Sequence, residues 1–102
     1  MRDRRLERIR RLVLAKKYRL SSHVLGGIES GEYCLEDVVR ATVYGETCTS
    51  HRDEKGTAVD GHKYVVTGPD TQGRAFRTVG KIQEWSDGQE YFFIAAFEVT
   101  ET

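Results

Sequence analysis

The pattern of apolar and polar residues is helical in roughly the first 45 positions and extended afterwards. Helices are expected over residues 4–17, 23–29 and 35–44, because apolar residues recur there at spacings of three and four. The glycine pair at 26–27 weakens the middle helix, whereas two acidic residues in the first turn favour the last one. Ser21 or Ser22 is expected to cap the middle helix.

The second half of the chain predicts strands separated by polar, glycine-containing turns. The expected strands cover residues 46–52, 62–67, 74–85 and 90–99. Gly80 is expected to bend or bulge the third of them. The last strand is apolar on both faces, so we expect it to lie inside the sheet.

Helices followed by strands predict an α+β fold with an antiparallel sheet. We therefore expect two to three N-terminal helices packed on one face of a four-stranded antiparallel sheet. The 102 residues suffice for a single core, so residues 1–102 are predicted to form one domain. Within it, residues 1–17 form a basic helix and residues 18–99 form the body.

Charge is distributed unevenly along the chain, although its total is zero. Residues 1–19 carry nine basic and two acidic side chains, whereas the remainder carries seven basic and fourteen acidic ones. The nucleic-acid-binding candidates in the basic segment are Arg4, Arg5, Arg8 and Arg11. Three interpretations stay open for this segment: it binds RNA or DNA, it binds an acidic protein or the chain's own acidic surface, or it is merely solvated.

Several function classes find little support in the sequence. No apolar run reaches the roughly 18–20 residues of a membrane span, so no membrane partner and a cytoplasmic location are expected. The cysteines Cys34 and Cys48 are too few for a disulfide framework. No cysteine or histidine pair has the spacing of a zinc site, so neither a metal nor another cofactor is expected.

Several short motifs occur in an order that resembles a known bacterial family. The motifs are Tyr18–His23, Leu35–Val39, Tyr44–Glu46, Tyr64–Gly68, Gly73–Val79 and Phe93–Phe97. Together they resemble the family called domain of unknown function 4258, a distant relative of the BrnT and RelE ribonuclease toxins of toxin–antitoxin pairs. The resemblance spans roughly residues 16–99 and implies a BrnT/RelE-like fold, a toxin-like activity on RNA and an antitoxin-like partner.

The sequence departs from the family pattern just after His23. Members of the family usually carry arginines a few residues after the Ser-x-His motif, but residues 24–29 contain none. The resemblance therefore bears on the fold more directly than on the activity.

A metal-free ribonuclease needs an acid or base and cations for the charge that develops on phosphate. His23 is the acid–base candidate, because imidazole titrates near neutral pH and this histidine matches the family motif. Arg77 and Lys81 would share one face of a strand, while Arg74 would lie on the other face. The competing interpretations are a structural histidine beside a helix cap and cations that are solvated or paired with carboxylates.

The leading hypothesis is a toxin-like RNA-binding protein or metal-independent endoribonuclease. Its candidate catalytic residues are His23, Arg77 and Lys81, and its candidate nucleic-acid-binding residues are Arg4, Arg5, Arg8, Arg11 and Arg74. The alternative is a non-catalytic protein-interaction module whose basic N-terminal helix docks an acidic partner. A homo-oligomer remains an open alternative for either function.

Overall fold

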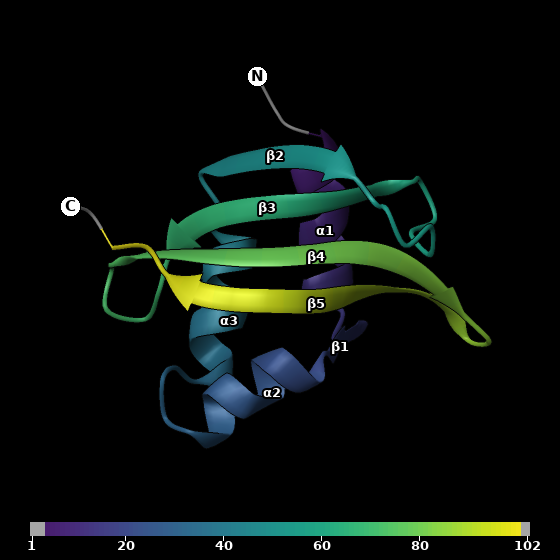
Figure 1. Ribbon diagram of the computed structural model, residues 1–102. Coiled ribbons are helices and arrows are strands. Elements are labelled where there is room, and N and C mark those ends of the chain that lie inside the picture. The colour runs from purple at the N-terminus through teal and green to yellow at the C-terminus, as the bar shows by residue number, and fades with distance from the viewer. Residues whose placement is uncertain (1–3, 101–102) are drawn as a thin grey trace.

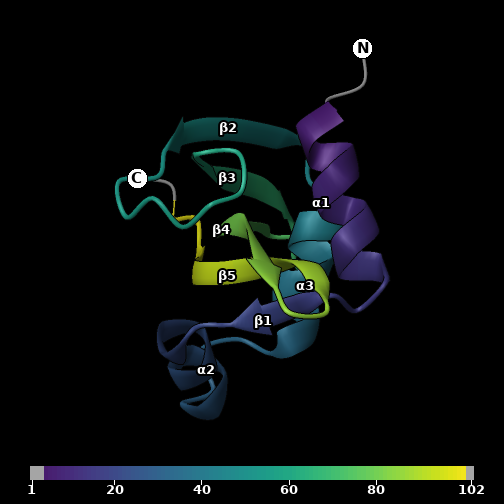
Figure 2. The same ribbon diagram turned by 90° about the vertical axis from the view of Figure 1, so that its right-hand side faces the viewer.

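Two helices cover one face of a five-stranded sheet, and a third helix lies beyond one edge of that sheet (Figures 1 and 2). The computed structural model describes residues 4–100; the first three residues of the predicted segment 1–17 lie outside this range. The helices are α1 (Arg4–Leu14), α2 (Ser22–Glu29) and α3 (Leu35–Val43). The strands are β1 (Tyr18–Leu20), β2 (Thr47–Arg52), β3 (His62–Pro69), β4 (Ala75–Trp85) and β5 (Gly88–Glu98). The predicted α+β class is confirmed.

The first helix is part of the core rather than an appended tail. Leu6, Ile9 and Val13 of α1 are buried, in agreement with the apolar stripe in the sequence. The helix ends at Leu14, and Lys16 then takes a left-handed backbone conformation with φ of 61°. Arg10 donates from its Nη2 to the carbonyl oxygen of Gly45 at 3.0 Å, which ties α1 to the end of α3.

The second helix begins at a serine cap that also contacts the sheet. The Ser21 hydroxyl accepts a hydrogen bond from the backbone N–H of Val24 at 3.2 Å and donates to the carbonyl oxygen of Ile94 at 2.7 Å. The backbone N–H of Ser21 donates to the carbonyl oxygen of Phe93 at 2.9 Å. Capping of this helix by Ser21 is thus confirmed, and the same residue fixes α2 to β5.

The sheet has the strand order β1-β5-β4-β3-β2 and is mixed. Its four longer strands pair antiparallel, but β1 pairs parallel to β5 with Tyr18 opposite Tyr91 and Leu20 opposite Phe93. The expected four-stranded, purely antiparallel sheet is therefore corrected to five strands. A strand of three residues is too short to show an alternating pattern, so the sequence analysis did not detect β1.

A register shift interrupts the pairing of β4 and β5 next to Gly80. Val79 lies opposite Ala95 and Gly80 opposite Phe93, so Ile94 is the extra residue of a bulge. A methyl group at Gly80 would run into the ring of Tyr91, which explains why the close packing here requires glycine. The expected irregularity at Gly80 is confirmed.

The core lies between the helix layer and one face of the sheet. Its largest fully buried side chains are Tyr91, Phe93, Ile9, Ile82, Val13, Val24, Val38 and Val66. The buried hydroxyls of Thr42 and Thr78 join α3 to β4 at 2.9 Å. No helix within residues 4–100 is long and apolar enough to cross a membrane.

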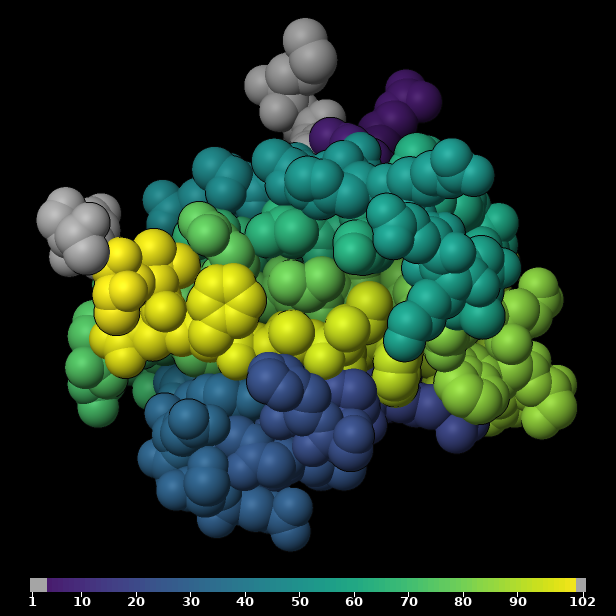
Figure 3. All heavy atoms as spheres, in the orientation of Figure 1, coloured from purple at the N-terminus to yellow at the C-terminus, as the bar shows by residue number. Residues whose placement is uncertain are grey.

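The opposite face of the sheet has no helix on it (Figures 1 and 3). Side chains that alternate with the core residues point to this side, including Val79, Arg77 and Lys81 of β4. The loop of residues 53–61 leans over one end of this face. We call it the open face of the sheet.

Two glycines with contrasting surroundings test this packing. At Gly68, a methyl group would meet the backbone carbonyl of Ala41, so Gly68→Ala is expected to lower the free energy of unfolding by about 1–3 kcal/mol. At Gly26 in α2, nothing lies within 4 Å, so Gly26→Ala should raise it by about 0.5–1 kcal/mol. Urea denaturation of both variants provides the measurement, and equal effects of the two changes would contradict the packing of α3 on β3.

Candidate functional site

The candidate arginines of α1 divide into two groups. Arg5 donates to the Ser50 hydroxyl at 2.8 Å, and Arg8 donates to the side-chain oxygen of Gln89 at 2.6 Å. Arg4 and Arg11 are exposed, and their side chains make no hydrogen bond or ion pair with any residue of the described range 4–100. Two guanidinium groups of α1 are therefore available to an external partner.

These two arginines share one side of α1 with Arg8. The spacing of four and then three residues places all three on the side opposite Leu6 and Ile9, and the span from Arg4 to Arg11 is about 10 Å along the axis. Glu7 is the one acidic residue of α1, and its carboxylate lies 3.7 Å from a guanidinium nitrogen of Arg10. We call Arg4, Arg8 and Arg11 the cationic face of α1.

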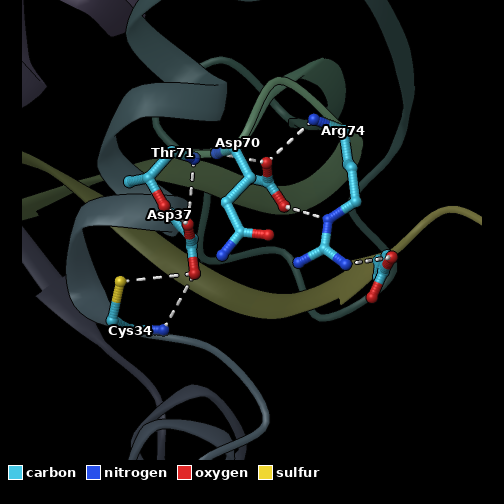
Figure 4. A network of polar contacts seen from close by, with 7 residues as sticks. Cys34, Asp37, Asp70, Thr71 and Arg74 are labelled. Carbon is cyan, nitrogen blue, oxygen red and sulfur yellow. Dashed lines mark hydrogen bonds and ion pairs between the residues drawn. The ribbon is translucent and has the colours of Figure 1, made fainter.

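Arg74 lies apart from this face, in the turn between β3 and β4 (Figure 4). Its guanidinium group is 3.5 Å from Asp70 and 3.7 Å from Glu98. The buried carboxylate of Asp70 also accepts the backbone N–H of Arg74 at 2.9 Å. Arg74 therefore closes the turn on itself, and the structure does not join it to the arginines of α1.

The same turn is held to the start of α3 by Asp37 (Figure 4). One carboxylate oxygen accepts from the backbone N–H and hydroxyl of Thr71 at 3.0 and 2.7 Å, and the other accepts from the backbone N–H and thiol of Cys34 at 3.1 and 3.3 Å. Burial opposes ionisation, but these hydrogen bonds outweigh it and lower the pKa of Asp37 to about 2.

Lys81 is buried on the open face, with only 4% of its surface exposed. Its ammonium nitrogen lies 3.3 and 3.4 Å from the two carboxylate oxygens of Asp53. Burial opposes ionisation of Asp53, but hydrogen bonds from Ala58 and Lys81 together with the lysine charge hold its pKa below the usual value. The sequence pattern placed Lys81 on one strand face with Arg77, but it gave no sign that Asp53 would cover the lysine.

The three catalytic candidates do not form one cluster. His23 is exposed near the start of α2 and lines a groove with Phe97 and the carboxylate residues Glu32 and Glu98. Arg77 donates to the Thr67 hydroxyl at 3.0 Å and lies opposite Phe97 in the sheet. Lys81 lines a different cleft, beside the loop of residues 53–61.

Metal chemistry finds no cluster in the part of the chain that the structure describes. Residues 4–100 contain no group of three His, Cys, Asp or Glu side chains that could hold a metal ion. Cys34 is exposed and Cys48 is half-buried in the sheet.

The chain was also compared with protein-family models, with curated proteins and with solved structures, and nothing matches it. The interpretation of its surface therefore depends on its own residues.

The buried ion pair predicts a large loss of stability when the lysine is removed. Lys81→Met should lower the free energy of unfolding by about 3–5 kcal/mol, because it leaves the buried carboxylate of Asp53 without a cation. Lys55→Gln, in the exposed part of the same loop, should change it by no more than about 0.5 kcal/mol. Chemical denaturation at pH 7 would measure both; similar small losses would show that the pair is not buried in solution.

The low pKa of Asp37 predicts a defined dependence of stability on pH. The carboxyl group titrates near 3.9 in an unfolded chain and at about 2 in the fold, so the unfolded state binds more protons between these values. Its stabilising contribution is present above about pH 4 and is lost as the pH falls towards 2. NMR titration of the carboxyl carbon gives the pKa directly, and a value near 4 would contradict the network of Figure 4.

Proposed function

We propose that the protein binds RNA through the cationic face of α1. The observation that carries the proposal is the burial of Leu6, Ile9 and Val13, which fixes the rotation of α1 on the sheet. Because that rotation is fixed, the arginines of the opposite side face solvent in a preformed arrangement. Such a surface needs little ordering when a partner binds.

Arginine suits this role because its planar guanidinium group donates two parallel hydrogen bonds to phosphate oxygens. Arg4 and Arg11 have no competing carboxylate within residues 4–100, and Arg8 contacts only the neutral side chain of Gln89. The exposed residues Lys16 and Lys17 extend the positive charge past the end of the helix. Release of counterions from the RNA would supply much of the binding free energy.

The proposed binding involves the phosphate backbone more than the bases. The described part of the basic segment before Tyr18 contains no aromatic residue on which a base could stack. Weak dependence on RNA sequence is therefore expected.

Cleavage of RNA is not part of the proposal. Lys81 is covered by Asp53, and the groove beside His23 contains the carboxylates of Glu32 and Glu98, which repel a phosphodiester. The toxin-like interpretation is retained only for its RNA-binding component.

An acidic protein is a second candidate partner, and one observation favours it. Leu14, at the end of α1, is 66% exposed beside the basic residues that follow the helix. An exposed apolar side chain next to arginines is a common feature of protein–protein interfaces. The two candidates differ in what should compete for α1.

The test removes the two unpartnered arginines together. In the double variant Arg4→Gln/Arg11→Gln, RNA affinity should fall, and the slope of log Kd against log salt concentration should decrease by about 2, one for each lost phosphate contact. Fluorescence anisotropy with a labelled 20-nucleotide RNA of mixed sequence, at 50–200 mM salt, provides the measurement. Lys55→Gln/Lys63→Gln, which removes two charges near the cleft on the open face, is the matched control and should leave the slope unchanged.

Poly-L-glutamate distinguishes the two candidate partners in the same assay. Displacement of RNA only at a large excess of carboxylate over phosphate supports RNA as the ligand. Tighter binding of poly-L-glutamate than of RNA at equal charge would instead favour an acidic protein and refute the proposal. A salt-independent affinity for RNA would also refute it.

A further inference from the structure

A cleft on the open face of the sheet contains the buried lysine. It has a volume of about 330 Å³ and lies between the loop of residues 53–61 and strands β4 and β5. Figure 3 shows this loop, in teal, overhanging the face beside β5, in yellow. The residues that matter for its chemistry are Lys81, Lys63, Lys55, Gln83, Phe92 and Ile94.

The loop that forms one wall is fixed to the sheet by hydrogen bonds. The backbone N–H of Val59 donates to the carbonyl oxygen of Ile82 at 2.8 Å, and the side-chain amide of Gln83 donates to the Thr57 hydroxyl at 3.1 Å. Within the loop, Asp53 accepts from the backbone N–H groups of Thr57 and Ala58 at 3.0 and 2.8 Å. The cleft is therefore a preformed feature, as small-molecule sites usually are.

Lys81 retains hydrogen-bonding capacity towards the cleft. An ammonium group has three N–H donors, and the contacts of Lys81 at 3.3 and 3.4 Å both go to the single carboxylate of Asp53. One carboxylate lies to one side of the nitrogen, so at least one donor remains for another acceptor. Because the lysine is almost fully buried and lines the cleft, a ligand in the cleft is the acceptor within its reach.

Charge and apolar surface are arranged around this donor in a specific way. Lys63 of β3 and Lys55 of the loop add positive charge, and the carboxylates lining the cleft are those of Asp53 and Glu54. Three cations and two anions leave one positive charge. Phe92, directly opposite Lys81 in the sheet, and Ile94 provide an apolar wall.

We infer that this cleft binds a small organic monocarboxylate with an apolar body. The carboxylate contacts Lys81 and Lys63, and the body packs on Phe92 and Ile94. A single excess positive charge matches one carboxylate better than a doubly charged phosphate. The site is independent of RNA binding, because α1 lies on the other face of the sheet (Figure 2).

The experiment uses phenylacetate as the probe and follows backbone amide signals of the full chain by ¹H–¹⁵N NMR. Saturable shifts confined to residues 53–63, 81–83 and 92–94 are expected. Phenylacetamide, a neutral molecule of nearly the same shape, should cause no saturable shift there, since it lacks the charge. Inorganic phosphate should bind more weakly than phenylacetate.

Lys63→Gln tests the charge contact without disturbing the buried ion pair. It should weaken phenylacetate binding about five- to tenfold, as expected for a partly exposed charge contact, whereas Lys16→Gln on the other side of the molecule should not change it. The inference is overturned if phenylacetate gives no saturable shift, if phenylacetamide or phosphate binds as tightly, or if both variants behave alike.

Discussion

The burial of β5 is the constraint on which the rest of the structure depends. Tyr91 and Phe93 are fully buried, so this strand needs a neighbour along each edge and the helix layer over one face. β4 supplies one neighbour through a hairpin, and β1 supplies the other from the opposite end of the chain. Pairing of β1 then sets where α1 ends and where α2 begins, and so decides how the basic helix is presented to solvent.

Most of the fold could be predicted because it follows from local periodicity. The stripe of α1, the cap at Ser21 and the irregularity at Gly80 each depend on residues close together in the sequence. β1 could not be predicted in this way, because three residues carry no period and its parallel partner lies about 70 positions away. That pairing is decided by the need to cover β5, which is a property of the whole chain.

The candidate site shows the same division between local and distant information. Strand parity correctly separated Arg77 and Lys81 from the core face of β4. It could not show that the loop of residues 53–61 brings Asp53 onto Lys81, nor that Arg74 pairs with Asp70 and Glu98. A cation on a strand face is therefore a candidate for phosphate binding only once the loops around it are placed.

The link between Ser21 and the bulge has a consequence for how the edge of the sheet opens. The Ser21 hydroxyl joins the first turn of α2 to the carbonyl oxygen of Ile94, the residue that the bulge leaves without a partner opposite it in β4. Separation of α2 from the sheet would therefore break the helix cap and expose the bulge in one event. Amide hydrogens of α2 and of this part of β5 then exchange with solvent as a single cooperative unit, slower than a terminal helix would on its own.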